Sequence, residues 1–130
     1  MAINLSNLAI SSSEPFDVEI THPATGEVLL DNGVPVTITV LSKTSNEYRS
    51  VLAAQQNARL KRTKKQDIIV EDFTRDGVEL LAAVTVGSNG LEYKGSEDVD
   101  FAELYGDVEM FWIKDQVYLA LEDNANFLAM

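Results

Sequence analysis

Hydrophobic residues alternate with polar ones in the first third of the chain, after a polar start. Residues 1–13 are small and polar with no sustained period, which predicts a flexible N-terminal arm. Phe16, Val18 and Ile20 then alternate with acidic residues, as in a strand that buries one face. The run Val36–Val40 repeats this alternation with threonines between β-branched residues, which strongly favours a strand.

Two turn sequences divide this region into three strands. Residues 22–26 (HPATG) combine a proline, which fixes one backbone dihedral, with a glycine that tolerates positive φ. Residues 31–33 (DNG) are a strong hairpin signal, and residues 27–30 form a second short strand between the two turns. The sequence therefore predicts a three-stranded antiparallel β-meander over residues 16–41.

The hydrophobic period changes to that of a helix after residue 42. Ser45 or Asn46 can cap a first helix, whose apolar residues lie three and four positions apart and which ends in a basic segment. The apolar spacing from Ile69 to Val84 predicts a second long helix, weakened at Gly77.

The last third of the chain is predicted to contain a loop and two more helices. Glycines and serines over residues 87–96 indicate an irregular connection with a short extended piece at 91–93. Asp98 or Asp100 can cap a short helix after it. A final helix is predicted over about 107–123, with one apolar face made of Met110, Ile113, Val117, Ala120 and Leu121.

This order of elements indicates the α+β class. An N-terminal β-meander at about 16–41 is followed by a region of three to four helices at about 46–124, which argues against a parallel α/β fold. The chain has 130 residues and is 45% hydrophobic, enough for one domain with a real core. We expect a single α+β domain over residues 14–130, preceded by the arm.

The composition indicates in which compartment the protein works and which classes of partner it binds. The absence of cysteine excludes a disulfide framework, a thiolate metal site and a cysteine nucleophile, and favours a reducing cytoplasm. No secretion signal is visible, and no apolar run approaches the roughly 18 residues that span a membrane. The formal net charge of −11 repels DNA, RNA and anionic membranes. Neither nucleic acid nor membrane is therefore an expected partner.

The residues that could carry chemistry do not form a recognisable catalytic or metal-binding pattern. His22 is the one histidine of the sequence, and we interpret it as a turn residue. Residues 97–100 (EDVD) place carboxylates at alternate positions but lack the remaining elements of a calcium loop, so a capping role is favoured. Nucleophile motifs and phosphate loops are absent. We expect no enzymatic activity, no metal and no cofactor.

The charges are unevenly distributed. Half of the basic residues lie in one short segment, whereas acidic residues dominate from Glu92 onward. Such asymmetry suits self-association, with the basic segment of one copy facing the acidic end of the next. The alternatives are a solvated helix end and contact with phosphates. The candidate self-association residues are Arg59, Lys61, Arg62, Lys64 and Lys65.

The final helix has more apolar residues than one face can bury. Residues 110–113 (MFWI) are consecutive and apolar, so they surround the helix. Either the helix is enclosed on two sides, or part of this girdle contacts a partner. A lone tryptophan is more often a core residue, and the apolar chain end could fold back as a local cap. The candidate partner-binding residues are Met110, Phe111, Trp112, Val117 and Phe127.

Several short segments together resemble a known family. They are residues 14–17 (EPFD), 22–26 (HPATG), 80–85 (LLAAVT) running into Gly87 and Gly90-Leu91, 112–117 (WIKDQV) and 126–128 (NFL). In this order and spacing, over about 14–128, the chain is similar to the tail assembly chaperones of long-tailed, siphovirus-type bacteriophages. It departs from the family pattern at Ser88, where relatives often carry tryptophan, which weakens any inference about this loop.

The resemblance implies a role without catalysis. Such chaperones coat the tape measure protein and keep it soluble in the host cytoplasm until tail tube subunits polymerise around it, and they are absent from the mature virion. The tape measure protein is thus the expected partner, the tail tube protein a further candidate, and a homo-oligomer is compatible with the charge asymmetry.

Three other classes compete with this expectation. A head-tail connector or tail-terminator protein would form stable rings and remain in the virion. An acidic inhibitor that mimics nucleic acid would need a dense carboxylate face, against which the interleaved apolar residues argue. An enzyme is the class that the sequence supports least.

Overall fold

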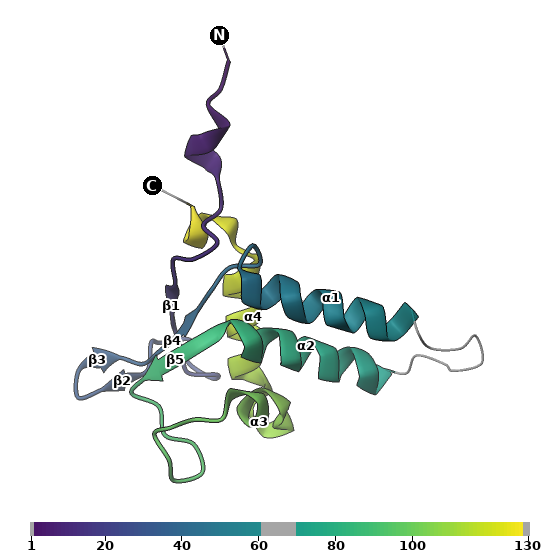
Figure 1. The fold of residues 1–130 in the computed structure, drawn as a ribbon. Helices are drawn as coiled ribbons and strands as arrows, with labels where there is room; N and C mark the ends of the chain where they lie inside the picture. Colours follow the sequence, from purple (N-terminus) through teal and green to yellow (C-terminus); the bar gives the residue numbers. More distant parts are fainter. Residues whose placement is uncertain (1, 61–69, 129–130) are drawn as a thin grey trace.

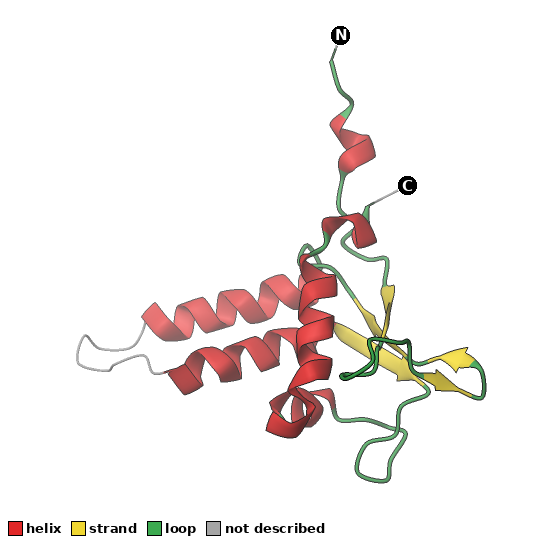
Figure 2. Cartoon of the chain, turned by 180° about the vertical axis from the view of Figure 1, so that it is seen from behind, coloured by secondary structure: helices red, strands yellow, loops and turns green. Residues whose placement is uncertain are grey.

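A computed structural model of the chain describes residues 2–60 and 70–128, and it confirms the α+β class. Figure 1 shows α1 (Asn46–Leu60) and α2 (Val70–Val84) side by side as a helical hairpin, with the strands beyond one end of it. Figure 2 shows α4 (Phe111–Glu122) standing between this hairpin and the strands. The start of the chain projects away from the body in both views.

The main sheet corrects the predicted meander. It consists of three antiparallel strands in the order β1 (Phe16–Glu19), β4 (Thr37–Val40) and β5 (Thr85–Asn89). The second neighbour of β4 therefore comes from the segment after α2, where a loop was predicted, and not from residues 27–30. The physical reason is that β4 needs hydrogen-bonding partners for both of its backbone edges, and β5 has the length to provide one.

The predicted hairpin turn is confirmed, but its strands are short. β2 (Leu30–Asp31) and β3 (Val34–Pro35) pair with each other as a separate two-stranded sheet. Between them, Asn32 and Gly33 have φ of 51° and 82°, the left-handed values that a two-residue hairpin loop requires.

The segment 27–30 still contacts both of its predicted neighbours. The Leu29 amide donates to the Ile20 carbonyl oxygen at 2.9 Å, and the Leu29 carbonyl accepts from the Val36 amide at 2.8 Å. The His22 amide also donates to the Glu27 carbonyl oxygen at 2.7 Å, and Thr21 and Val28 form an isolated antiparallel bridge. The segment is nevertheless not a strand of the main sheet.

The caps proposed for two helices are confirmed. At the start of α1, Ser45 Oγ accepts a hydrogen bond from the Tyr48 amide at 3.2 Å. At the start of α3 (Phe101–Gly106), Asp100 Oδ1 accepts from the Glu103 amide at 3.2 Å. These side chains satisfy amides that the first helical turn leaves without a partner.

Tighter turns precede or follow the regular helices. The final helix begins at Phe111 and not near residue 107, because the residues before it form a 3-10 turn. The predicted extended piece at 91–93 is not a strand, although Tyr93 and Ser96 form an isolated bridge. The 3-10 helices of the described residues are η1 (Leu5–Leu8), η2 (Val108–Met110) and η3 (Asn124–Phe127).

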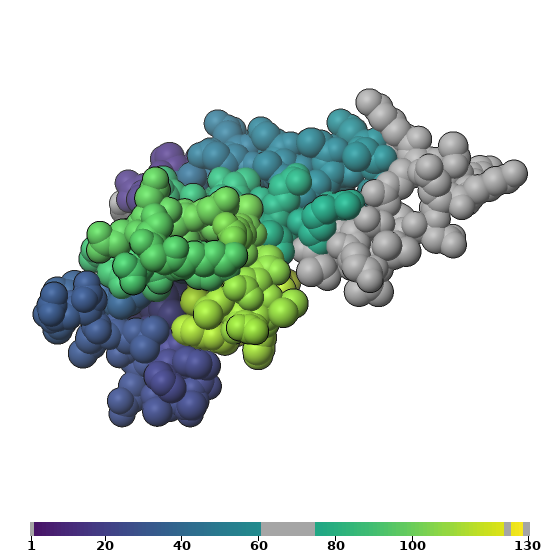
Figure 3. Space-filling view, turned by 90° about the horizontal axis from the view of Figure 1, so that it is seen from below, coloured from purple at the N-terminus to yellow at the C-terminus, as the bar shows by residue number. Residues whose placement is uncertain are grey.

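One hydrophobic core joins the sheet to the helices. It contains the inward residues of β1 and β4 and one stripe from each of α2, α3 and α4. Figure 3 views the molecule from below, where the green segment that includes α3 lies beside the yellow-green start of α4. The buried apolar residues are Val18, Ile20, Val36, Ile38, Val40, Leu81, Val84, Leu104, Tyr105, Ile113, Val117, Leu121 and Phe127.

The two ends of the chain meet at one edge of this core. The Phe16 and Phe127 rings pack edge to face with centroids 5.8 Å apart. The Ser11 amide donates to the Phe127 carbonyl oxygen at 2.7 Å, and the Ser11 carbonyl accepts from Ser42 Oγ at 2.5 Å and Thr44 Oγ1 at 2.9 Å. The end of the arm is therefore attached to the domain.

Tyr105 connects α3 to the start of β5 inside the core. Its hydroxyl lies 2.8 Å from Thr85 Oγ1, which also donates to the Leu81 carbonyl at 2.7 Å. Burial raises the pKa of Tyr105 to about 12, and the hydrogen bond to Thr85 opposes this shift only in part.

Tyr105 should make folding stability fall at alkaline pH. The raised pKa means that its contribution is complete below about pH 10 and is lost as the pH rises toward 12. A shift of two pKa units corresponds to a loss of about 2–3 kcal/mol in the free energy of unfolding once the pH exceeds the raised pKa. In urea unfolding between pH 8 and 11.5, the free energy of unfolding should decline less steeply for Tyr105→Phe than for the wild type. The exposed Tyr118→Phe is the control and should decline like the wild type.

Gln116 joins α4 to the end of the first strand region. Its Oε1 accepts from the Thr21 amide at 2.8 Å, and its Nε2 donates to the Thr21 carbonyl at 3.0 Å. The side-chain amide thus takes the place of a neighbouring strand at this residue.

Gln116→Ala should destabilise the fold by about 1–3 kcal/mol, because it leaves a part-buried backbone amide and carbonyl without partners. The free energy of unfolding in urea measures this loss. Gln56→Ala, on the exposed side of α1, is the matched control and should change stability by no more than about 0.5 kcal/mol. Equal effects at the two positions would contradict the role assigned to Gln116.

Candidate partner-binding surface

The last helix buries a narrow stripe of apolar side chains. Ile113, Val117 and Leu121 follow one another four residues apart and lie in the core. A period of about 3.6 residues places them on one face of α4, which packs toward the sheet, α2 and α3. The other side of the helix faces away from the core.

Large apolar side chains remain exposed on that other side. Phe111 is 58% exposed and Leu119 is 66% exposed. The helical period places two acidic residues beside them. We call this surface the outer face of α4, and it consists of Phe111, Asp115, Leu119 and Glu122. The prediction that one face cannot bury all apolar residues of this helix is confirmed.

Two predicted contact residues belong to the core and are corrected here. Val117 is 0% exposed and Phe127 is 3% exposed, so neither contributes to the surface of the described structure. Val117 lies at the centre of the buried stripe, and Phe127 covers the edge of the sheet, as the alternative of a local cap proposed. Of the others, Phe111 is exposed, whereas Met110 and Trp112 are half-buried against the core.

The basic residues proposed for self-association are only partly described. Arg59 Nη2 forms an ion pair with Asp76 Oδ2 at 2.6 Å, which links α1 to α2. Gln55 Nε2 supports the same link by donating to the Asp76 carbonyl at 2.9 Å. Arg59 therefore has a structural role within the helical hairpin. The remaining four residues, Lys61, Arg62, Lys64 and Lys65, lie outside the described residues.

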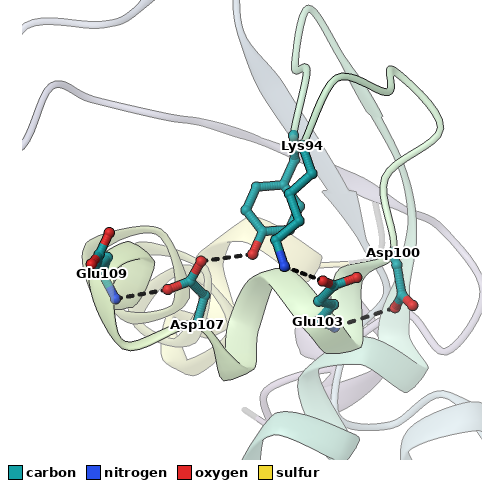
Figure 4. A network of polar contacts seen from close by, with 6 residues as sticks. Lys94, Asp100, Glu103, Asp107 and Glu109 are labelled. Atoms are coloured by element: carbon teal, nitrogen blue, oxygen red, sulfur yellow. Dashed lines mark hydrogen bonds and ion pairs between the residues drawn. The ribbon is translucent and has the colours of Figure 1, made fainter.

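The acidic segment before α4 forms a network of polar contacts (Figure 4). The Tyr93 hydroxyl donates to Asp107 Oδ2 at 2.7 Å, and Asp107 Oδ1 accepts from the Glu109 amide at 2.9 Å. The hydrogen bond from the Tyr93 hydroxyl is the main cause of the lowered pKa of Asp107. Lys94 pairs with Glu103 on α3. These acidic residues fix the loop and the start of the last helix.

The residues considered for chemistry have structural roles. His22 Nδ1 accepts from the Ala24 amide at 3.0 Å and from the Thr25 amide at 3.3 Å, so it closes the turn in which it was predicted to lie. In the described parts of the chain, no group of three histidine or acidic side chains is placed to hold a metal ion. Within the same residues, no helix combines the length and the apolar character needed to cross a membrane.

A cleft between α1, α2 and α4 was not predicted. Its volume is about 270 Å³. No local pattern indicates it, because its lining comes from three helices that are far apart along the chain. The lining residues are Lys43, Tyr48, Gly77, Val78, Leu80, Leu81, Lys114, Asp115, Tyr118 and Leu121.

Substitutions at the two phenylalanines should separate the core from the surface. Phe127→Ala should cost about 3–5 kcal/mol of unfolding free energy, because it leaves a cavity beside Phe16. Phe111→Ala should change stability by no more than about 0.5 kcal/mol, because its side chain is exposed. Chemical denaturation measures both, and comparable losses would mean that Phe111 is packed and not available to a partner.

In a comparison with known proteins, no protein-family model, no curated protein and no solved structure matches this chain. What the chain does is therefore inferred from its own residues and their arrangement.

Proposed function

We propose that this chain is a tail assembly chaperone of long-tailed bacteriophages, which acts without catalysis. It binds the tape measure protein and keeps it soluble in the host cytoplasm until tail tube subunits polymerise. The observation that carries the proposal is the outer face of α4, where Phe111 and Leu119 stay exposed while the opposite stripe of the helix is buried. Exposed apolar side chains that share one face of a helix offer apolar area that a partner can bury.

The composition of the outer face suits a chaperone for an apolar helical protein. Phe111 and Leu119 supply apolar area for affinity, and an amphipathic helix can lie against such a surface. Asp115 and Glu122 interrupt the apolar area, and Glu122 also pairs with Lys43. The net charge of −11 then keeps the complex soluble.

Co-expression with the tape measure protein tests the proposal. The wild-type chain should move that protein from the pellet to the supernatant, and Phe111→Asp and Leu119→Asp should each reduce the soluble fraction severalfold. A carboxylate at either position opposes burial of the surface in an apolar contact. Leu60→Asp is the matched control, because Leu60 is also an exposed helical leucine, at 82%. This variant should keep the tape measure protein as soluble as the wild-type chain does.

The outcomes separate the function from the site. If the wild-type chain fails to keep the tape measure protein soluble, the proposed function is wrong. If both Asp variants rescue as well as Leu60→Asp, the function stands but the outer face of α4 is not the contact. Detection of the chain in purified virions at a structural copy number would favour a connector or tail-terminator protein instead.

A further inference from the structure

The cleft between α1, α2 and α4 combines an apolar lining with a lysine side chain. Val78, Leu80 and Tyr118 supply apolar lining, and Lys114 is a lining residue of the same cleft. Among the described residues, no carboxylate forms an ion pair or hydrogen bond with Lys114, whereas the other lysine of the cleft, Lys43, pairs with Glu122. An occupant that matches this cleft has an apolar side chain beside a carboxylate.

The chain itself presents such a pair of side chains on η2. Val108 is 83% exposed, more than any other large hydrophobic residue in the described part of the chain, and the neighbouring Glu109 is also exposed. We call these two residues the 108–109 knob. Asp107 holds the turn by accepting from the Glu109 amide at 2.9 Å, and Tyr93 holds Asp107 by donating to it at 2.7 Å. The knob is therefore a fixed feature of the surface and not a loose loop.

We propose that the cleft of one copy receives the 108–109 knob of a second copy. Val108 covers the apolar lining, and the Glu109 carboxylate meets the Lys114 ammonium. Asp115 is the one acidic residue among the described residues that line the cleft, so it repels the incoming carboxylate, whereas Lys114 attracts it. The chain's charge of −11 makes most contacts between copies repulsive, and a lysine in an apolar cleft is a local exception.

The knob cannot enter the cleft of its own chain. η2 leads directly into α4, whose residues 114–121 form one wall of the cleft, so the two surfaces are held apart on one helix. A contact between copies then either repeats from copy to copy or closes as a pair in which each knob enters the other's cleft. This self-association uses neither Phe111 nor Leu119, although the cleft lining and the outer face of α4 share Asp115. Its test therefore does not rely on the two apolar residues proposed to bind the tape measure protein.

Charge reversal tests the contact directly. In sedimentation equilibrium the wild-type chain should show a weight-average mass that rises with protein concentration. Lys114→Glu and Glu109→Lys should each weaken association about tenfold or more, because each places like charges together. Glu92→Lys is the matched control, since it changes the net charge as Glu109→Lys does but at an exposed acid outside knob and cleft, and it should associate like the wild type.

An equimolar mixture of the two charge-reversed variants gives the decisive result. The unchanged Glu109 of one variant meets the unchanged Lys114 of the other. In the reciprocal contact, the lysine introduced at position 109 meets the glutamate introduced at position 114. Both contacts are again between opposite charges, so the mass should return toward that of the wild type. Misfolding of either variant cannot produce this recovery.

Val108→Ser should weaken association without a change of charge, and circular dichroism should show the same helix content for all variants. A wild-type chain that stays monomeric at every concentration would overturn the proposal, as would a mixture that does not recover. Because the co-expression experiment depends on the outer face of α4, failure here leaves the chaperone function untouched, and failure there leaves self-association untouched.

Discussion

The packing of α4 against the rest of the domain is the constraint on which this structure depends. Ile113, Val117 and Leu121 fill the space between the sheet and the other helices, and no other described helix buries so many residues from one stripe. Gln116 adds two hydrogen bonds to the backbone of Thr21, which fixes how far the helix can rotate or slide along the strands. Once this face is fixed, the direction of every other α4 side chain follows from the helical period.

Much of the fold could be predicted because local sequence signals agree with it. The alternation in β1 and β4, the turn at Asn32 and Gly33, and the caps Ser45 and Asp100 all operate over a few residues. β5 could not be recognised, because its TVGSN sequence contains residues typical of turns and its partner is more than forty residues earlier. The local pattern of β4 marks it as a strand but does not show that its second partner lies so far along the chain.

The sequence predicts that the last helix has an exposed apolar surface, but not which residues form it. Four consecutive apolar residues show that part of the last helix stays exposed, but they do not say which part. That depends on which stripe packs, and the structure places Val117 inside and Phe111 outside. The cleft with Lys114 is formed by three helices, so its shape depends on tertiary packing alone. A lysine next to the apolar girdle was visible in the sequence, but its position in an apolar cleft was not.

The residues that carry the resemblance to tail assembly chaperones mostly build the fold. In the WIKDQV segment, Val117 is buried and Gln116 bonds the strand region, while in NFL Asn126 Nδ2 donates to the Ala120 carbonyl at 2.9 Å and Phe127 is buried. Sequences that keep these residues keep the position of α4, whatever they bind. The apolar residues of the outer face, Phe111 and Leu119, lie outside both motifs, although Asp115 belongs to the first of them. A shared fold and a shared partner are therefore separate claims for this chain. The side chains that determine the fold face the core, whereas the side chains proposed to bind the partner face outward.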